Sequence, residues 1–147
     1  MFNKILVTLD GSELAERALQ PAFALAEKFG AEIVLLRVPL TQRYVSMPSG
    51  SGVLLPEQVV ERDREETEAY LRAVKTQWLG TAPKIRTEAI SGDPAAVILD
   101  VAETEAADLI VMSTHGRSGL SRLLYGSVAE SVLRGARSPV LLVPLNP

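Results

Sequence analysis

Short apolar runs alternate along this chain with amphipathic stretches, and each run ends in a turn. Four runs are nearly continuous: Ile5–Leu9, Ala31–Val38, Leu109–Met112 and Pro139–Val143. Continuous apolar strands are typical of a parallel sheet that is covered on both faces. The segment Lys84–Ile90 instead alternates polar and less polar residues, as an edge strand does. The pattern therefore predicts five strands.

The stretch after the first expected strand predicts a helix that ends at Gly30. Ser12 has the side chain of a helix N-cap, and the apolar stripe that follows recurs at helical spacing as far as Phe29. Pro21 interrupts this pattern because it lacks an N–H and crowds the carbonyl group of Arg17. We expect a kink at this proline.

Three further helices are expected between the later strands. One extends from about Pro56 to Leu79, one begins at Asp93-Pro94, and one begins at Gly126-Ser127. A capping aspartate followed by proline is a strong helix start. The apolar face of the long helix consists of Val59, Val60, Tyr70, Leu71, Val74 and Trp78.

Alternating strands and helices predict an α/β protein with a doubly wound parallel sheet, five strands and four helices. A length of 147 residues fits one domain over 1–147. The segment 39–55 has no periodicity and contains Ser49-Gly50-Ser51-Gly52, so we expect a flexible loop there. Loops of this length in compact domains are usually functional or disordered.

A glycine-bearing loop follows the fourth expected strand. Met112 leads into Ser113-Thr114-His115-Gly116, and after nine intervening residues Gly126-Ser127 opens the last helix. Strand, glycine loop and helix start together are typical of phosphate binding, because backbone N–H groups and the helix dipole face the anion. The alternative is that these glycines only allow tight turns. The loop is neither a P-loop nor a GxGxxG fingerprint, since no lysine occurs after Lys84 and the close glycine pair is missing.

The segment STHGRSGLSRLLYGS resembles the signature of the universal stress protein family. That signature is Gly, two residues, Gly, nine residues, then Gly followed by Ser or Thr; Ser113 stands at its first glycine. The resemblance extends to ILVTLDGSE and SPVLLVP and covers the whole chain, with residues 39–80 matched least. It implies a Rossmann-like fold, related to the adenine nucleotide alpha hydrolases, with strand order 3-2-1-4-5.

In such a sheet, ligands bind at the carboxyl ends of the strands where the order reverses, here between the first and fourth strands. Asp10 and Ser113 end these two strands and so fall at the same place. The resemblance to the ATP-binding subgroup implies ATP, ADP or AMP as the ligand, with Asp10 near the ribose or an Mg²⁺ ion and the Val38 backbone at the adenine edge. The implied site consists of Thr8, Asp10, Val38, Met112, Ser113, Gly116, Gly126, Ser127 and Val128. His115 and Arg117 of the same loop are added as candidates, Arg117 because its guanidinium is always cationic, although each can equally be a solvated loop residue.

Several of these residues have a structural alternative. Asp10 can simply bond within its own turn, and Ser127 can simply be the N-cap of the last helix. Asp10, Ser12 and His115 suggest a catalytic triad, but the chain has no G-x-S-x-G elbow. We therefore expect binding rather than catalysis, with slow ATP hydrolysis at most.

A second function class is a nucleotide-free dimeric scaffold with the same fold. Some members of the family lack the residues that bind nucleotide, whereas this chain keeps Gly116 and the Gly126-Ser127 pair. These glycines favour nucleotide binding over the scaffold.

The strand Pro139–Pro144 is expected at the sheet edge, where an apolar strand is an aggregation hazard unless it is covered. Its open N–H and C=O groups suit antiparallel pairing with a second copy, and proteins similar to this one commonly dimerise that way. We therefore expect a homodimer.

Composition restricts the partners. The net charge of −3 argues against nucleic acid, which needs a basic face. The chain has no cysteine, and no apolar stretch approaches the ~20 residues that a membrane-spanning helix needs. Met1 to Lys4 leads into the first strand without a signal peptide, so we expect a cytoplasmic protein with no membrane partner.

Overall fold

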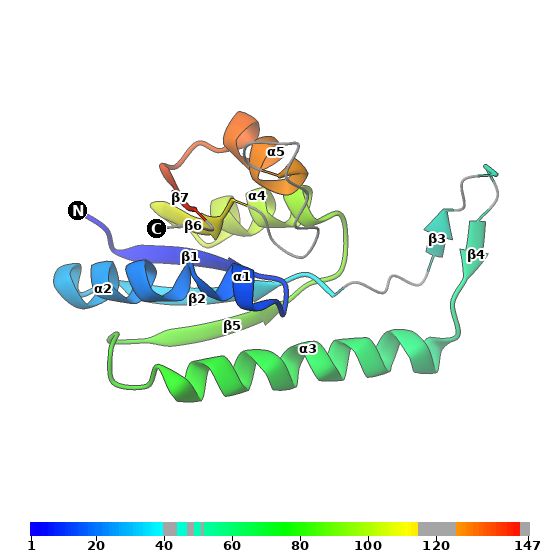
Figure 1. Ribbon diagram of the computed structural model, residues 1–147, viewed down its shortest axis with the longest axis horizontal. Coiled ribbons are helices and arrows are strands. Elements are labelled where there is room, and N and C mark those ends of the chain that lie inside the picture. Colours follow the sequence, from blue (N-terminus) through cyan, green and yellow to red (C-terminus); the bar gives the residue numbers. More distant parts are fainter. Residues whose placement is uncertain (40–43, 47–48, 51, 115–125, 145–147) are drawn as a thin grey trace.

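The computed structural model describes residues 1–39, 44–46, 49–50, 52–114 and 126–144. Its centre is a parallel sheet of five strands in the order β5-β2-β1-β6-β7 (Figure 1). Counted along this sheet alone, the order is 3-2-1-4-5, so the predicted fold class is confirmed. The strands are β1 (Lys4–Leu9), β2 (Glu32–Arg37), β5 (Ile85–Ala89), β6 (Leu109–Ser113) and β7 (Val140–Val143).

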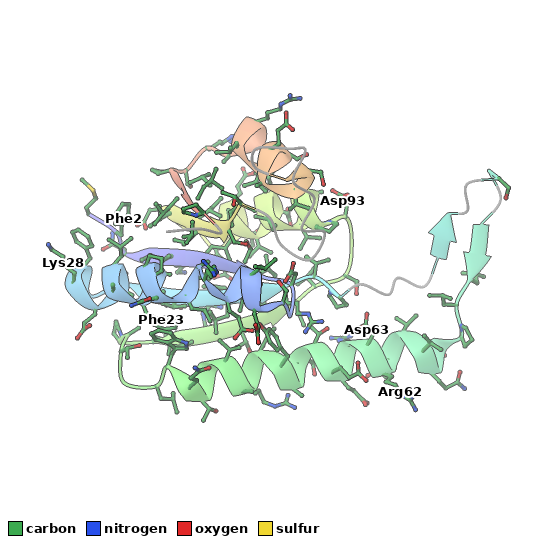
Figure 2. All side chains as sticks on the ribbon, in the orientation of Figure 1. Phe2, Phe23, Lys28, Arg62, Asp63 and Asp93 are labelled. Carbon is green, nitrogen blue, oxygen red and sulfur yellow. The ribbon has the colours of Figure 1, made fainter. Side chains whose placement is uncertain are left out.

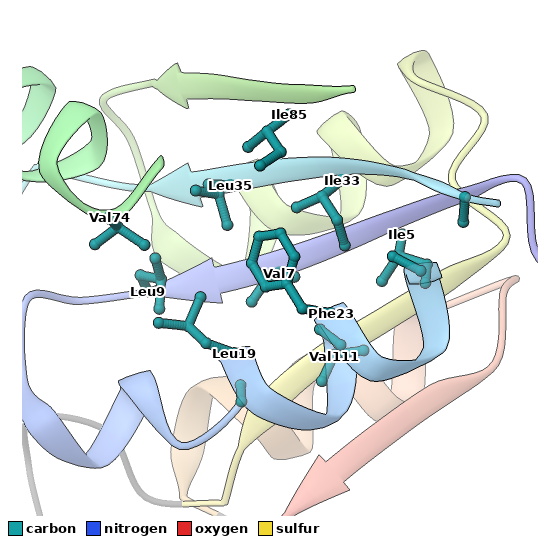
Figure 3. Close-up of a cluster of buried hydrophobic side chains, with 14 of the residues drawn as sticks. Ile5, Val7, Leu9, Leu19, Phe23, Ile33, Leu35, Val74, Ile85 and Val111 are labelled. Atoms are coloured by element: carbon teal, nitrogen blue, oxygen red, sulfur yellow. The ribbon is translucent and has the colours of Figure 1, made fainter. Parts of the chain in front are cut away.

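Two layers of helices cover the sheet. The helices α2 (Leu19–Phe29) and α3 (Glu57–Gln77) pack on one face, and α4 (Pro94–Thr104) and α5 (Ser127–Gly135) pack on the other. Phe23 of α2 lies over the strands at the centre of the first layer (Figure 3). Its ring also stacks on Trp78 with a centroid separation of 4.6 Å. The sheet is therefore buried on both faces, as its apolar strands predict.

The first predicted helix is divided into α1 (Glu13–Glu16) and α2. Pro21 becomes the third residue of α2, within the first turn, where N–H groups have no acceptor inside the helix. The chain therefore places the missing N–H of the proline where it costs least. In place of a kink at Pro21, the helix is interrupted at Arg17 and Ala18, which keep helical backbone angles but donate to the carbonyl groups three residues before them.

The long helix α3 extends beyond the sheet at its amino-terminal end. Val59 is 45% exposed, so its predicted place on the apolar inner face is wrong. Arg62 and Asp63 lie on this projecting part (Figure 2). Before it, β3 (Tyr44–Ser46) and β4 (Gly52–Leu54) form an antiparallel pair within the segment predicted as loop, and this pair projects away from the sheet (Figure 1).

The predicted start of α4 is confirmed. The Asp93 side chain (Figure 2) accepts a hydrogen bond from the Ala96 N–H at 3.0 Å, and Pro94 is the first helical residue. This cap fixes where the chain leaves the edge strand β5 and enters the second helical layer.

A group of ion pairs ties the edge strand β5 to the rest of the sheet. Arg86 Nε donates to Glu32 on β2 at 2.6 Å, and the other guanidinium nitrogens donate to Glu105 at the end of α4. Glu88 lies 3.6 Å from the same guanidinium, and Lys4 Nζ on β1 lies 3.5 Å from Glu105. One arginine thus holds three carboxylates together.

Arg86 lowers the pKa values of two carboxyl groups in this group of ion pairs. Its hydrogen bonds are the main reason why the pKa values of Glu32 and Glu105 lie below their ordinary value of 4.5. A carboxyl group with a lowered pKa in the folded protein contributes stability that is fully present above its unfolded pKa. That contribution is lost as the pH falls through the folded pKa.

We expect Arg86→Met to lower the free energy of unfolding at pH 7 by about 1–2 kcal/mol, because the half-buried carboxylates lose their shared cation. The difference between this variant and the unchanged protein should shrink as the pH falls below 4.5. Urea denaturation at neutral and acidic pH measures both quantities.

Arg134→Met is the matched control. Arg134 pairs with Glu130 at 2.7 Å on α5, but its side chain is 78% exposed. An exposed pair of this kind contributes roughly 0.5 kcal/mol or less. Equal losses in the two variants, or a loss at Arg86 that does not depend on pH, would contradict the role assigned to Arg86.

Candidate functional site

The strand order reverses between β1 and β6, so the carboxyl ends of these two strands define the candidate site. The strands are paired in parallel with Val7 opposite Val111. Continuing this register places Leu9 opposite Ser113, and Asp10 immediately follows. The two ends predicted to meet at one edge of the sheet therefore do so.

The turn after β1 orients Asp10. Asp10 Oδ1 accepts hydrogen bonds from the Ser12 N–H at 2.9 Å and from the Ser12 hydroxyl at 2.5 Å. Ser12 Oγ in turn accepts from the Ala15 N–H at 3.1 Å, which confirms Ser12 as the cap of the first helix. The alternative that Asp10 bonds within its own turn is also confirmed. The same bonds hold its carboxylate at the end of β1.

The other predicted residues near β1 and β2 offer mainly their backbone. Thr8 is half-buried within β1. Val38 follows β2 and packs against the core under α4 and α5. Met112 belongs to the same core and is 4% exposed, so its side chain is occupied by packing.

Ser113 ends β6 and is 7% exposed. It lies opposite Val143 of β7, and the following Thr114 N–H donates to the Val143 carbonyl at 3.0 Å. The residue that replaces the first signature glycine is therefore part of the sheet. A small hydroxyl side chain fits this buried position.

The amino end of α5 begins at Gly126. This glycine is the N-cap, with φ of 80° and ψ of 156°, and Ser127 is the first helical residue. The alternative that Ser127 is the N-cap is therefore wrong, because the first helical bond runs from the Glu130 N–H to the Gly126 carbonyl at 3.0 Å. Val128 is partly buried against the core beside it.

The first N–H groups of α5 have no acceptor inside the helix, as in any α-helix. A glycine cap has no side chain to accept from them, and Gly126 makes no side-chain capping bond. The positive end of the helix dipole lies at the same point. This end of α5 is suited to hold an anion.

His115, Gly116 and Arg117 were also predicted for the site, and they lie outside the described residues. Within the described ranges, no three His, Cys, Asp or Glu side chains come together as a metal-binding group. In the same ranges, no helix combines the length and the apolar character that crossing a membrane requires.

Two residues close to the site were missed by the sequence analysis. Arg37 at the end of β2 and Tyr70 of α3 lie beside the turn that contains Gly11. Burial, and then the nearby carboxylate of Glu16, raise the pKa of Tyr70 well above its ordinary value of 10.0. The signal available in the sequence was Arg37, a charged residue that follows four apolar residues, Ile33 to Leu36, at the end of its strand.

The sequence of this chain is similar to those of known proteins. A model of the universal stress protein family matches residues 1–144. Universal stress protein MJ0531 of Methanocaldococcus jannaschii is 39% identical over 144 residues, which cover 97% of this chain and 82% of that protein.

Solved structures of other proteins share the fold of this chain. The structure of hypothetical protein MJ0577 has a TM-score of 0.76 at 29% identity and covers 98% of this chain and 96% of its own. A crystal structure of a universal stress protein in complex with cAMP has a TM-score of 0.72, with 99% and 98% covered. At 23% identity, this second likeness shows the fold alone. The family match and the sequence relative show that the chain belongs to the universal stress protein family.

Proposed function

We propose that this protein is a dimeric module that binds an adenine nucleotide, ATP or its products ADP and AMP, in stress response or signalling. The proposal depends mainly on where α5 begins. This glycine-capped helix start lies at the end of the sheet where the carboxyl ends of β1 and β6 meet. The Asp10 carboxylate lies at the same edge.

Each part of the site has a chemical role in this proposal. The N–H groups of Ser127 and Val128 donate to phosphate oxygens, and the dipole of α5 favours the negative charge. The Asp10 carboxylate accepts from ribose hydroxyls. The backbone at Val38 recognises the adenine edge, and Thr8, Met112 and Ser113 form the floor with their backbone.

Three further residues of the proposal come from the loop between β6 and α5. Gly116 allows the backbone to approach the phosphates, and Arg117 adds a forked cationic donor. His115 lies next to them in the sequence. All three belong to the signature segment that the family match covers.

Likeness to a known complex adds support. The universal stress protein solved with cAMP has the same fold, so this fold can accommodate an adenine nucleotide. Mg²⁺ fits the donor set, because this ion is usually held by one or two carboxylates together with the phosphates of a substrate. Asp10 supplies one carboxylate. We propose binding rather than turnover, in the cytoplasm.

Isothermal titration of the purified protein with ATP and Mg²⁺ tests the proposal directly. We expect measurable heat and a rise of the melting temperature with nucleotide concentration, since a ligand that binds only the folded state stabilises it. Mass analysis of nucleotide released on denaturation identifies any resident ligand. The proposal would be overturned if about 1 mM nucleotide produced no heat and no thermal shift. A Kd of about 1 mM corresponds to a binding free energy of about −4 kcal/mol.

We expect Gly126→Val to abolish nucleotide binding. Its φ of 80° is strained for a residue with a β-carbon, and the added methyl groups would lie where phosphate oxygens approach. Strain of this kind costs on the order of 1–3 kcal/mol. Ser127→Ala is the control, because it keeps the backbone donor and removes only the hydroxyl. A soluble Gly126→Val protein with cooperative melting and unchanged affinity would refute the phosphate assignment.

The proposed dimer forms through β7, which lies at the sheet edge as predicted. The carbonyl groups of Pro139 and Val143 accept from β6, so the alternation of a parallel ladder turns these residues toward β6. Val140 and Leu142 then direct their N–H and C=O groups outward. Among the described residues no backbone bond to these outward groups is found, so they can pair with a second copy of the strand.

Leu142→Pro should therefore shift the protein toward monomer, because it removes an outward N–H and leaves the bonds to β6 in place. Leu141→Pro is the comparison, since its N–H faces β6 and its loss should destabilise the sheet itself. Light scattering and thermal melting separate the two effects. A monomeric unchanged protein at tens of micromolar would rule out the dimer.

A further inference from the structure

Arg37 leaves the sheet on the face opposite to Val38. Along β2, Ile33 and Leu35 belong to the core under α2 and α3, whereas Val34 and Leu36 belong to the core under α4 and α5. Side chains alternate between the two faces of a strand, so Arg37 follows the first pair. Its side chain therefore lies on the face of the sheet that α2 and α3 cover, near the carboxyl ends of the strands.

The guanidinium of Arg37 is packed against the turn after β1. Gly11 has a φ of +86°, and a β-carbon at this residue would lie 2.8 Å from Cζ and Nη1 of Arg37 and 2.9 Å from Nη2. These distances are too short for a real contact, so the guanidinium fills the space of a missing side chain. The turn needs glycine for its backbone angle, and the guanidinium occupies the space that a side chain at this position would take.

The same guanidinium contacts α3. Arg37 Cζ lies 4.9 Å from the centroid of the Tyr70 ring, which is cation–π geometry. Arg37 Nε and the Tyr70 hydroxyl are both buried, and neither has a hydrogen-bond partner among the described residues. The contact therefore depends on packing and on the charge over the ring, and it joins the turn to α3.

The charges around this contact favour a cation. The carboxylates of Glu16 and Asp10 both raise the pKa of Tyr70, whereas Arg37 opposes them. The charge of Glu16 is the larger of its effects on the Tyr70 hydroxyl, which forms no hydrogen bond of normal geometry within the described part of the chain. Arg37 thus places a positive charge beside the same Tyr70 hydroxyl that the carboxylates of Asp10, which follows β1, and Glu16 of α1 also influence.

Arg37 connects the two halves of the proposed nucleoside contact. It is adjacent in sequence to Val38 and lies opposite Leu9 in the β1–β2 register, while it touches Gly11 next to Asp10. We propose that Arg37 is a positioning residue that fixes the Asp10–Ser12 turn relative to Val38 and so sets the affinity for the nucleoside part of the ligand. This inference rests on the proposed nucleotide binding.

Arg37→Met tests the proposal, because it keeps a long apolar side chain and removes the guanidinium. A small displacement of a binding group costs affinity steeply, and we expect the Kd for ATP to rise about tenfold. Arg72→Met on the exposed side of α3 is the matched control and should leave the Kd unchanged. Thermal melting of both variants reports on the fold.

Two further measurements distinguish positioning from general damage to the fold. In an Asp10→Asn background, Arg37→Met should raise the Kd little further, because the turn it positions no longer carries the carboxylate. In the protein without nucleotide, Arg37→Met should speed amide exchange at Ser12 and Ala15, whose N–H groups donate within the turn. A general loss of stability would multiply with Asp10→Asn and would not be confined to these amides.

Tyr70 gives a second pair of variants in case Arg37→Met folds poorly. Tyr70→Phe keeps the ring face and should retain affinity, whereas Tyr70→Leu removes it and should weaken binding. If the unchanged protein binds ATP but the Arg37 and Tyr70→Leu variants bind equally well, or the effects simply multiply with Asp10→Asn, the inference is overturned and the proposed function stands. If the unchanged protein does not bind, both are overturned.

Discussion

The hydrogen bonding of β1 on both sides is the constraint on which the rest of the structure depends. This strand pairs with β2 from Lys4 to Leu9 and with β6 through Ile5, Leu6 and Val7. Those three residues are fully buried, so the strand cannot shift without exposing apolar surface on both faces of the sheet. The position of Asp10, one residue beyond this strand, is therefore determined by the core.

The fold was predictable because apolar content and turn chemistry agree along most of the chain. Continuous strands predicted a buried parallel sheet, and the caps at Ser12 and Asp93 marked two helix starts that the structure confirms. The errors occur where packing partners, rather than local pattern, decide the structure. Val59 continues the apolar face of α3, but it lies in the first turn of this helix, whose amino-terminal end projects beyond the sheet (Figure 1), and it is 45% exposed.

The candidate site was predictable only in part. Asp10 and Ser113 could be brought together in advance because parallel strands end at one edge and the resemblance supplied their order. The cap of the last helix could not be predicted, since glycine and serine are both common in that position and only the backbone angles distinguish Gly126 from Ser127. Arg37 and Gly11 are separated in sequence by the helices α1 and α2. No local pattern predicts their contact, because it requires the register of β1 and β2.

The two ends of the sheet use their polar groups differently. At the amino ends of the strands, Asp108 accepts from the N–H groups of Asn3 and Lys4, and Arg86 neutralises Glu32 and Glu105. At the carboxyl ends, the helix start at Gly126 presents donors with no side-chain acceptor from its cap. Because the first N–H groups of a helix have no acceptor inside it, a ligand or water satisfies these donors. The amino end therefore serves stability, and the carboxyl end is where the proposed binding function belongs.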